Sequence, residues 1–265
     1  MTNDKRASRT TQYAILAFVI AFIALWFVPD VVAWLNRDAD EAWARVQQSG
    51  VIRFAIDPSY MPFDGLGSEG VFYGIDVDIA QEVARRSGLR AEFVIAGQDS
   101  LYDVLAVGQA DATISALIVN SSLIGRWQYS TAYFDVGQVL VKPRGSSTDV
   151  SSLAVEFGSD GDAAARHWAR RQAGIEVRSF PTANEALQAV DAGQVDAAIV
   201  DAVSARQLLM KSYPQLQLAD YVTHDPLAMA VWGESTQLLT AINRALAEMQ
   251  QDGTTQRIIE EWMVK

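Results

Sequence analysis

A short segment that occurs twice is the feature that most constrains the fold of this chain. Residues 108–114 read Gly-Gln-Ala-Asp-Ala-Thr-Ile and residues 193–199 read Gly-Gln-Val-Asp-Ala-Ala-Ile, so five of seven positions match at an offset of 85. In each copy the glycine suits the left-handed cap that ends a helix, and the aspartate suits the turn before a buried strand. Such joints are common in α/β proteins, so convergence is one explanation. Because the order of elements around the two copies also matches, we expect two similar α/β lobes.

The hydrophobic pattern around both copies alternates between strands and helices. Short apolar runs indicate buried strands, and apolar residues at helical spacing indicate helices. The predicted strands are 51–56, 91–95, 112–115, 153–157 and 195–200, and the predicted helices are 76–87, 100–107, 162–172 and 182–190. A capping box of Thr182 and Glu185 opens the last of these helices. This rhythm predicts an α/β fold with mostly parallel sheets.

Charge and composition exclude several classes of function. The net charge is −11, with no basic patch interleaved with aromatic residues, so the surface would repel nucleic acid. The absence of cysteine excludes disulfides, thiolate metal sites and cysteine nucleophiles. Two histidines, His167 and His224, are too few for a zinc site, and no Walker loop, dinucleotide fingerprint or nucleophile elbow is present. Asp76 and Asp78 resemble a carboxylate pair but fall at a predicted helix start, where the helix dipole accounts for them. We therefore predict a protein without catalysis, cofactor or metal.

An apolar segment near the N-terminus predicts contact with a membrane. Thr10–Pro29 contains 20 residues without a charge, which as a helix would span roughly 30 Å, the thickness of a bilayer core. Positive charges precede it, so the rest of the chain is predicted to lie outside the cytoplasm. A cleaved signal peptide is the alternative. The run is long for a signal peptide and no small-residue cleavage site follows it closely, so we predict an uncleaved anchor.

Five motifs occur in an order that identifies a family. They are Asp57–Phe63 (Asp-Pro-Ser-Tyr-Met-Pro-Phe), Gly74–Ala80, the two Gly-Gln-x-Asp-Ala segments, Gly137–Val141, and Gln251–Thr254 before Trp262. Together they resemble family 3 extracellular solute-binding proteins, the polar amino-acid receptors of ABC importers, over about residues 46–265. The resemblance implies an α/β, two-lobed type II periplasmic-binding fold. Two hinge crossover strands, near 137–141 and 227–231, would let the lobes close on a ligand.

This reading predicts the domain organisation and the function. Residues 1–36 are a cytoplasmic tip and transmembrane anchor, 37–45 a linker, 46–138 with 226–265 lobe 1, and 139–225 lobe 2. The expected function is an extracytoplasmic receptor, anchored in the cell membrane, that binds an amino acid or related amine and delivers it to an ABC permease. A ligand-sensing domain that signals to a membrane partner and a cyclohexadienyl-dehydratase-like enzyme are the alternatives.

The candidate binding residues follow from the expected position of the ligand and from the resemblance. In open α/β sheets a ligand lies beyond the carboxyl ends of the strands, and here the segments at those ends are polar or rich in glycine. The predicted ligand-binding residues are Asp57, Tyr60, Phe63, Ser115, Ala116, Ile118, Arg126, Glu156, Gly158, Ser159, Asp160 and Asp201.

The resemblance assigns roles to some of these residues. It implies that Tyr60 forms an aromatic wall against the ligand and that Asp201 holds the ammonium group of the ligand. The alternatives are a surface tyrosine packed on Pro62 and a helix N-cap. Phe63 is otherwise a core residue, and Asp57 is otherwise a turn former.

The loop Gly158–Gly161 lies between a predicted strand and a predicted helix. Exposed amides at a helix N-terminus suit an anion, and the resemblance implies that this loop grips a carboxylate. Asp160 and Asp162 place negative charge at the same position. A tight turn capped by Ser159 or Asp160 is therefore the alternative.

Two apolar residues depart from the family pattern. Relatives usually have Thr or Ser in place of Ile118 and Arg in place of Leu123, and these clamp the carboxylate of the amino acid. Arg126 is a candidate to replace the missing arginine, and a surface arginine is the alternative. The other charged candidates are acidic, namely Asp57, Asp135, Glu156, Asp160 and Asp201. We therefore expect a cationic or zwitterionic ligand whose binding depends only weakly on an α-carboxylate.

Overall fold

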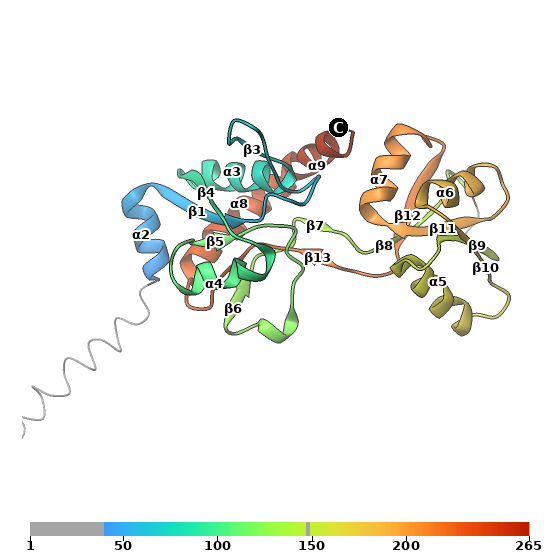
Figure 1. The fold of residues 1–265 in the computed structure, drawn as a ribbon, viewed down its shortest axis with the longest axis horizontal. Coiled ribbons are helices and arrows are strands. Elements are labelled where there is room, and N and C mark those ends of the chain that lie inside the picture. Colours follow the sequence, from blue (N-terminus) through green and yellow to red (C-terminus); the bar gives the residue numbers. More distant parts are fainter. Residues whose placement is uncertain (1–39, 147–148, 265) are drawn as a thin grey trace, which may run out of the picture.

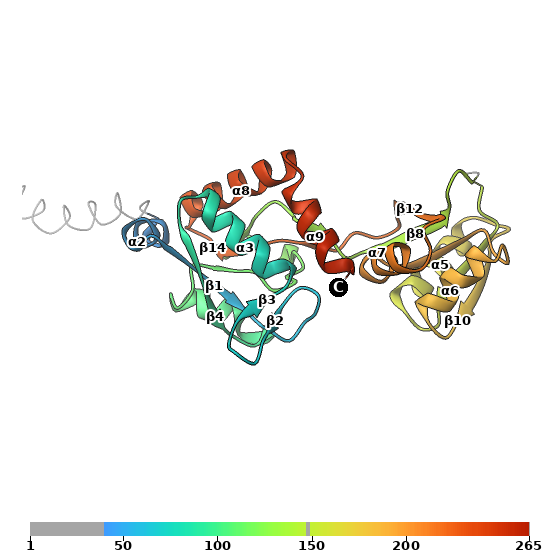
Figure 2. The ribbon, with the colours of Figure 1, turned by 90° about the horizontal axis from the view of Figure 1, so that it is seen from above.

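The computed structural model describes residues 40–146 and 149–264, which form two lobes joined by two crossing segments (Figure 1). The view turned by 90° shows the same two lobes (Figure 2). The predicted tip and anchor, residues 1–36, and the first part of the predicted linker lie outside the described residues. Within the described ranges, no helix combines the length and the apolar character that a membrane span requires.

Lobe 1 is built from the two ends of the described chain, blue to green and red in Figure 1. Its five-stranded sheet has the order β4-β1-β5-β14-β6. The main strands are β1 (Val51–Ile56), β4 (Arg90–Ile95), β5 (Ala112–Thr113), β6 (Trp127–Tyr129) and β14 (Ala230–Trp232). The helices are α2 (Glu41–Ser49), α3 (Ile75–Arg86), α4 (Leu101–Ala106), α8 (Thr236–Gln251) and α9 (Thr254–Val264). Short pairs β2 (Gly65–Leu66) with β3 (Phe72–Tyr73), and β7 (Phe134–Asp135) with β13 (Pro226–Leu227), complete the lobe together with the 3-10 turns Gln98–Ser100 and Ser121–Leu123.

Lobe 2 is built from the middle of the chain, yellow to orange in Figure 1. Its sheet has the order β10-β9-β11-β8-β12. The strands are β8 (Gln138–Pro143), β9 (Ser152–Glu156), β10 (Glu176–Phe180), β11 (Ala197–Asp201) and β12 (Leu216–Tyr221). The helices are α5 (Asp160–Arg171), α6 (Ala183–Asp191) and α7 (Ala202–Lys211). Helix α7 also packs against α9 of lobe 1.

The two sheets share one topology. In each sheet the first three strands in this order are parallel to one another. The fourth strand, β14 in lobe 1 and β8 in lobe 2, is antiparallel to both of its neighbours. Both sheets are therefore mixed, rather than mostly parallel as expected. The reason is that β8 and β14 each follow a crossing and enter their sheet at the edge where the parallel strands end. Gln138 at the start of β8 accordingly pairs with Asp201 at the end of β11.

Alternate residues of each central strand enter different hydrophobic cores. In lobe 1, Phe54 packs toward α3 and α8, whereas Ala55 packs toward α4. In lobe 2, Ala154 packs toward α6, whereas Leu153 and Val155 pack toward α5. Burial of each large apolar side chain contributes about 2 kcal/mol. The two lobes therefore each have helices on both faces of a buried sheet.

The repeated segment occupies equivalent positions in the two lobes. Gly108 and Gly193 both end a helix with φ of 69°. Asp111 accepts a hydrogen bond from the amide of Arg53 at 2.9 Å, and Asp196 accepts one from the amide of Ser152 at 2.9 Å. In both lobes this bond joins the turn before one strand to the neighbouring parallel strand. The predicted duplication is confirmed at this level.

The two crossing segments lie side by side between the lobes. The amide of Val136 donates to the carbonyl of Asp225 at 3.1 Å, and the amide of Gln138 donates to the hydroxyl of Thr223 at 2.9 Å. Gly137 approaches the carbonyl of Thr223 so closely that no Cβ would fit. The second crossing, residues 222–225, precedes the expected segment 227–231, because Ala230–Trp232 is a strand of the lobe 1 sheet.

Asp135 holds both crossings together. Its carboxylate accepts hydrogen bonds from the amides of Gly137 and Asp225, each at 2.9 Å, and contacts Nδ1 of His224 at 2.7 Å. Burial raises the pKa of Asp135, but these donors outweigh burial and lower it below its ordinary value. This expected ligand-binding carboxylate therefore has a structural role at the hinge.

Candidate ligand-binding site

An acidic pocket of about 350 Å³ opens at the carboxyl ends of the lobe 2 strands. The residues that line it are Gln138, Glu156, Gly158, Ser159, Asp160, Val200 and Asp201. Five of the predicted binding residues therefore come together here. Three of the lining side chains are carboxylates, and none of the seven is basic. Such a lining attracts a cation and repels an anion.

Two helix N-termini explain why carboxylates are stable at this edge. The carboxylate of Asp201 caps α7 by accepting a hydrogen bond from the amide of Ser204 at 2.8 Å. Asp160 lies in the first turn of α5, where the helix dipole favours negative charge. The alternative role of Asp201, a helix N-cap, is confirmed, and its predicted contact with a ligand stays a prediction. The same geometry also presents this carboxylate to the pocket.

Hydrogen bonds close the turn formed by Gly158–Gly161 and the first residues of α5. The amide of Gly158 donates to the carboxylate of Asp162 at 3.2 Å, and the amide of Asp162 donates to the hydroxyl of Ser159 at 3.1 Å. Asp162 also forms an ion pair with Arg166 at 2.8 Å. The loop is therefore a capped turn that already contains an anionic group, which disfavours the carboxylate grip implied by the resemblance.

On the lobe 1 side, Asp57 and Ser115 are joined. The hydroxyl of Ser115 accepts a hydrogen bond from the amide of Asp57 at 3.0 Å. The carboxylate of Asp57 accepts bonds from the hydroxyl of Ser59 at 2.7 Å and the amide of Gln98 at 2.9 Å. These bonds give Asp57 the turn-forming role, on the loop that follows β1.

Three packed aromatic rings of lobe 1 end at a contact with an arginine of lobe 2. Tyr60 is 60% exposed, and its ring stacks on Phe63 with centroids 5.9 Å apart. Phe63 is 2% exposed and packs on Phe134 at 5.8 Å. The guanidinium of Arg206, on α7 of lobe 2, lies over the ring of Phe134, 5.5 Å from its centroid. Phe63 is thus a core residue that supports Tyr60, and Tyr60 alone of this pair is accessible to a ligand.

Beneath the lobe 1 loops lies a cluster of buried carboxyl groups. Asp64 and Asp76 are both fully buried. The hydroxyl of Ser115 donates to Asp64 at 2.8 Å, and the amide of Ala116 donates to Asp76 at 2.5 Å. Ala116 has a positive φ of 43°, which a non-glycine residue rarely adopts, so the turn at Ala116 is strained. Asp76 was predicted to be a charge at a helix start. It does lie in the first turn of α3, but its burial was not predicted.

Burial changes the ionisation of both groups. Burial, and after it the charge of Asp76, raises the pKa of Asp64 to about 9. Burial also raises the pKa of Asp76 to about 7, although the amide of Ala116 acts in the opposite direction. Asp64 could not be singled out from the sequence, because it is a single acidic residue next to a turn.

The residues at the departures from the family pattern lie apart from the acidic pocket. Ile118 is 48% exposed and forms a bridge with Leu227. Leu123 packs with the cluster on the α4 side of the sheet. Arg126 lies over the ring of Trp127, 5.5 Å from its centroid. Arg126 is exposed and takes part in a cation–π contact, which corresponds to the surface alternative.

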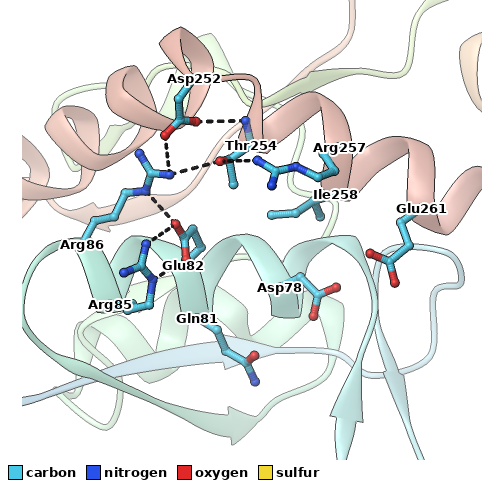
Figure 3. A pocket seen from close by; sticks show the side chains of 10 residues that line it. All are labelled: Asp78, Gln81, Glu82, Arg85, Arg86, Asp252, Thr254, Arg257, Ile258 and Glu261. Carbon is cyan, nitrogen blue, oxygen red and sulfur yellow. Dashed lines mark hydrogen bonds and ion pairs between the residues drawn. The ribbon is translucent and has the colours of Figure 1, made fainter.

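Two larger hollows differ from the acidic pocket in their charges. One, of about 720 Å³, lies between α3 and the junction of α8 and α9 (Figure 3). Arg86 there bonds Glu82 and Asp252, each at 2.7 Å, and its side chain is only 12% exposed. These charges hold the helices together. The other hollow, of about 880 Å³, runs along α5 beside residues 222–225 and shares Gln138 and Asp160 with the acidic pocket.

Comparison with known proteins identifies the family. The family model for bacterial extracellular solute-binding proteins, family 3, matches residues 52–265. The chain belongs to this family. The match includes both lobes and both crossings, so membership accounts for the whole described fold apart from α2.

Curated relatives of this solute-binding protein bind amino acids. The L-cystine-binding protein TcyJ of Escherichia coli (strain K12) is 27% identical over 226 residues, which cover 82% of this chain and 84% of the relative. The histidine-binding periplasmic protein of the same strain is 27% identical over 249 residues, which cover 84% of this chain and 91% of the relative. Among solved structures, an ancestral cationic amino acid solute-binding protein is 25% identical with a TM-score of 0.58, covering 83% of this chain and 98% of the other.

Two pocket residues were not predicted from the sequence, the apolar Val200 and the polar Gln138. Gln138 is the one that can bond a ligand. It is 8% exposed, lines the acidic pocket and stands opposite Asp201 in the sheet. The signal that could have found it is its position at the first residue after Gly137, where a crossing strand enters lobe 2. Phe134 and Arg206 gave no comparable signal, because their contact joins elements distant in sequence.

Proposed function

We propose that this solute-binding protein is the receptor of an ABC importer and that it binds a cationic amino acid or a related amine between its lobes. The observation that carries the proposal is the lining of the lobe 2 pocket, where Glu156, Asp160 and Asp201 converge without a basic residue. The amino acid specificities of the curated relatives support the class of ligand.

The two lobes would contribute different contacts to one ligand. The carboxylates of lobe 2 would hold the cationic group, and the exposed ring of Tyr60 would stack against it from lobe 1. A ligand that contacts both lobes binds the closed form better than the open form and shifts the population toward it. Ile118 and Leu123 offer no charge to an α-carboxylate, so the carboxylate should add little affinity.

We also propose that the chain acts as a receptor and not as an enzyme, outside the cytoplasm, with the segment Thr10–Pro29 as its membrane anchor. The periplasmic location given in the name of the histidine-binding relative and the apolar composition of that segment support this location. Fractionation of cells that express the full chain should recover it with membranes and leave it open to external protease in spheroplasts. Recovery in the cytoplasm would contradict the proposed location.

Calorimetry on the purified protein tests the ligand class. L-arginine, L-lysine and putrescine represent cations with and without an α-carboxylate, and L-glutamate represents an anion. We expect binding of at least one of the first three and none of L-glutamate. Tight binding of L-glutamate without binding of any cation would overturn the proposal.

A further inference from the structure

The Asp64 and Asp76 carboxyl groups form a buried pair that the proposed ligand contacts do not use. Asp64 lies between β1 and β2, and Asp76 lies in the first turn of α3. Both side chains are fully buried. Each has one oxygen, Oδ1, that is buried and has no hydrogen-bond partner among the described residues, and the hydroxyl of Tyr133, which lies beside Asp76, is buried and unpaired as well. An ionised carboxylate in such a place is costly, so these oxygens require an explanation.

Within residues 40–146 and 149–264, no counter-charge accounts for the pair. The charged group that acts on Asp64 besides Asp76 is Asp57, which is also acidic. The remaining neighbours are the hydroxyl of Ser115, the amide of Ala116 and the hydroxyl of Tyr133, all of them neutral. The ion pairs of lobe 1 involve other carboxylates, such as Asp111 and Glu82. Two buried like charges without a cation cannot both be stable, and the usual result is that one carboxyl stays protonated.

The pair is joined to two loops of lobe 1, the loop after β1 and the turn at Ala116. Asp64 binds the hydroxyl of Ser115, and that hydroxyl also accepts the amide of Asp57. Asp76 binds the amide of Ala116, whose positive φ of 43° needs such support. Separation of the two carboxyl groups would therefore move the loop after β1 and the turn at Ala116 together.

We propose that Asp64 and Asp76 hold one proton between them and that this proton positions the loops of Asp57 and Ala116 for ligand binding. The second part rests on the proposed function, whereas the shared proton does not. The raised pKa of Asp64, about 9, agrees with a carboxyl that remains protonated at neutral pH. Above a pH of about 9 both groups become charged and repel each other, so ligand affinity should fall.

Infrared spectroscopy of the unliganded full-length protein tests the proton directly. At pH 7 we expect a protonated-carboxyl C=O band in the wild type and in the control Asp78→Asn, whose carboxylate instead accepts the indole N–H of Trp262. At pH 8 the band should be much weaker in Asp64→Asn than in the wild type, since an amide replaces the proton and Asp76, whose pKa is raised to about 7, is mostly ionised. In the wild type the band should fade as the pH rises through about 9. A wild type without the band at pH 7 would overturn the proposal, even if the variant fails to fold.

Calorimetry with L-arginine tests the positioning. The ratio of wild-type to Asp64→Asn affinity cancels titration of the ligand itself. We expect this ratio to fall about tenfold between pH 8 and pH 10, because the variant keeps a neutral group at all pH values and each pH unit beyond a pKa removes a factor of ten. A constant ratio would overturn the positioning role. If L-arginine does not bind at pH 7 but the band is present, the proposed function fails and the shared proton stands.

Discussion

The two lobes have the same topology but support it with different chemistry. In lobe 1 the repeated aspartate, Asp111, is buried and bonds Arg45 and Arg53 at 2.5 and 2.9 Å. In lobe 2 the equivalent Asp196 is exposed, and its carboxylate accepts hydrogen bonds from the amides and hydroxyls of Ser151 and Ser152. The duplicated segment therefore specifies a backbone joint, whereas the partners of its aspartate are free to change.

The ligand-facing edges differ in the same way. Lobe 1 has exposed Tyr60 above a buried carboxyl pair, and lobe 2 has an open pocket of carboxylates at helix N-termini. We infer that lobe 1 supplies the shape of the site and that lobe 2 supplies its charge.

The largest difference should appear in stability. Asp111→Ala leaves Arg53, whose side chain is 28% exposed, without its partner, and should lower the free energy of unfolding by about 3 kcal/mol. Asp196→Ala, the matched change in lobe 2, removes solvent-exposed hydrogen bonds from neutral donors and should cost about 1 kcal/mol. Urea unfolding of both variants measures the difference. Equal losses of unfolding free energy in the two variants would show that the buried ionic joint is no more stabilising than the exposed polar one.

Ligand affinity should show the next largest effect. Asp201→Asn removes a pocket charge and should weaken L-arginine binding about 100-fold. Asp57→Asn should weaken it only about fivefold, because the carboxylate of Asp57 is engaged with Ser59 and Gln98. Asp220→Asn, the same charge change on an exposed residue of lobe 2, is the control and should have no effect. A larger loss from Asp57→Asn than from Asp201→Asn would place the charge of the site in lobe 1.

The pH dependence of stability should have opposite signs in the two lobes. Hydrogen bonds from Ser151 and Ser152 lower the pKa of Asp196 to about 2, so its contribution is complete above its ordinary pKa and is lost as the pH falls through 2. Burial raises the pKa of Asp64 to about 9, so its contribution is greatest below its ordinary pKa and is lost as the pH rises toward 9.

Two variants separate these slopes. Asp196→Asn should flatten the melting temperature on the acid side, and Asp64→Asn should flatten it on the alkaline side, as measured by thermal unfolding between pH 2 and pH 10. If the melting temperature of Asp64→Asn falls with alkaline pH as it does in the wild type, the buried carboxyl pair is not the cause of that fall.

The smallest effect concerns the aromatic face of lobe 1. Tyr60→Ala should weaken L-arginine binding about fivefold through loss of a cation–π contact, while Tyr60→Phe should retain affinity. Because Phe63 keeps its packing on Phe134, the melting temperature should change little. Equal losses in the two variants would assign the contact to the hydroxyl instead of the ring.

Local patterns predicted most of the fold. The helix predicted over 76–87 is α3 (Ile75–Arg86), and the strand predicted over 51–56 is β1, because each has a regular apolar face and a clear end. The strands after the two crossings could not be oriented from local pattern. Their direction depends on where the chain enters each sheet, which is a property of the whole fold.

The candidate site was predictable in part for the same reason. Glu156, Asp160 and Asp201 follow predicted strands and come together in the pocket. Arg126 does not, because its partner Trp127 is adjacent in sequence and holds it at the surface. The buried pair of Asp64 and Asp76 depends on a contact between a turn and a helix start, and neither residue differs in pattern from an exposed acid.

The proposed function requires that a cation closes two lobes that differ in charge. The chain has no cysteine, so Asp103→Cys on α4 and Arg170→Cys on α5, both exposed, allow clean spin labelling of one residue in each lobe. Pulsed electron paramagnetic resonance should show the distance distribution between the labels change to a shorter, narrower one with a cation that calorimetry shows to bind, and remain unchanged with L-glutamate. An unchanged distance distribution with that bound cation would contradict closure of the lobes on the ligand.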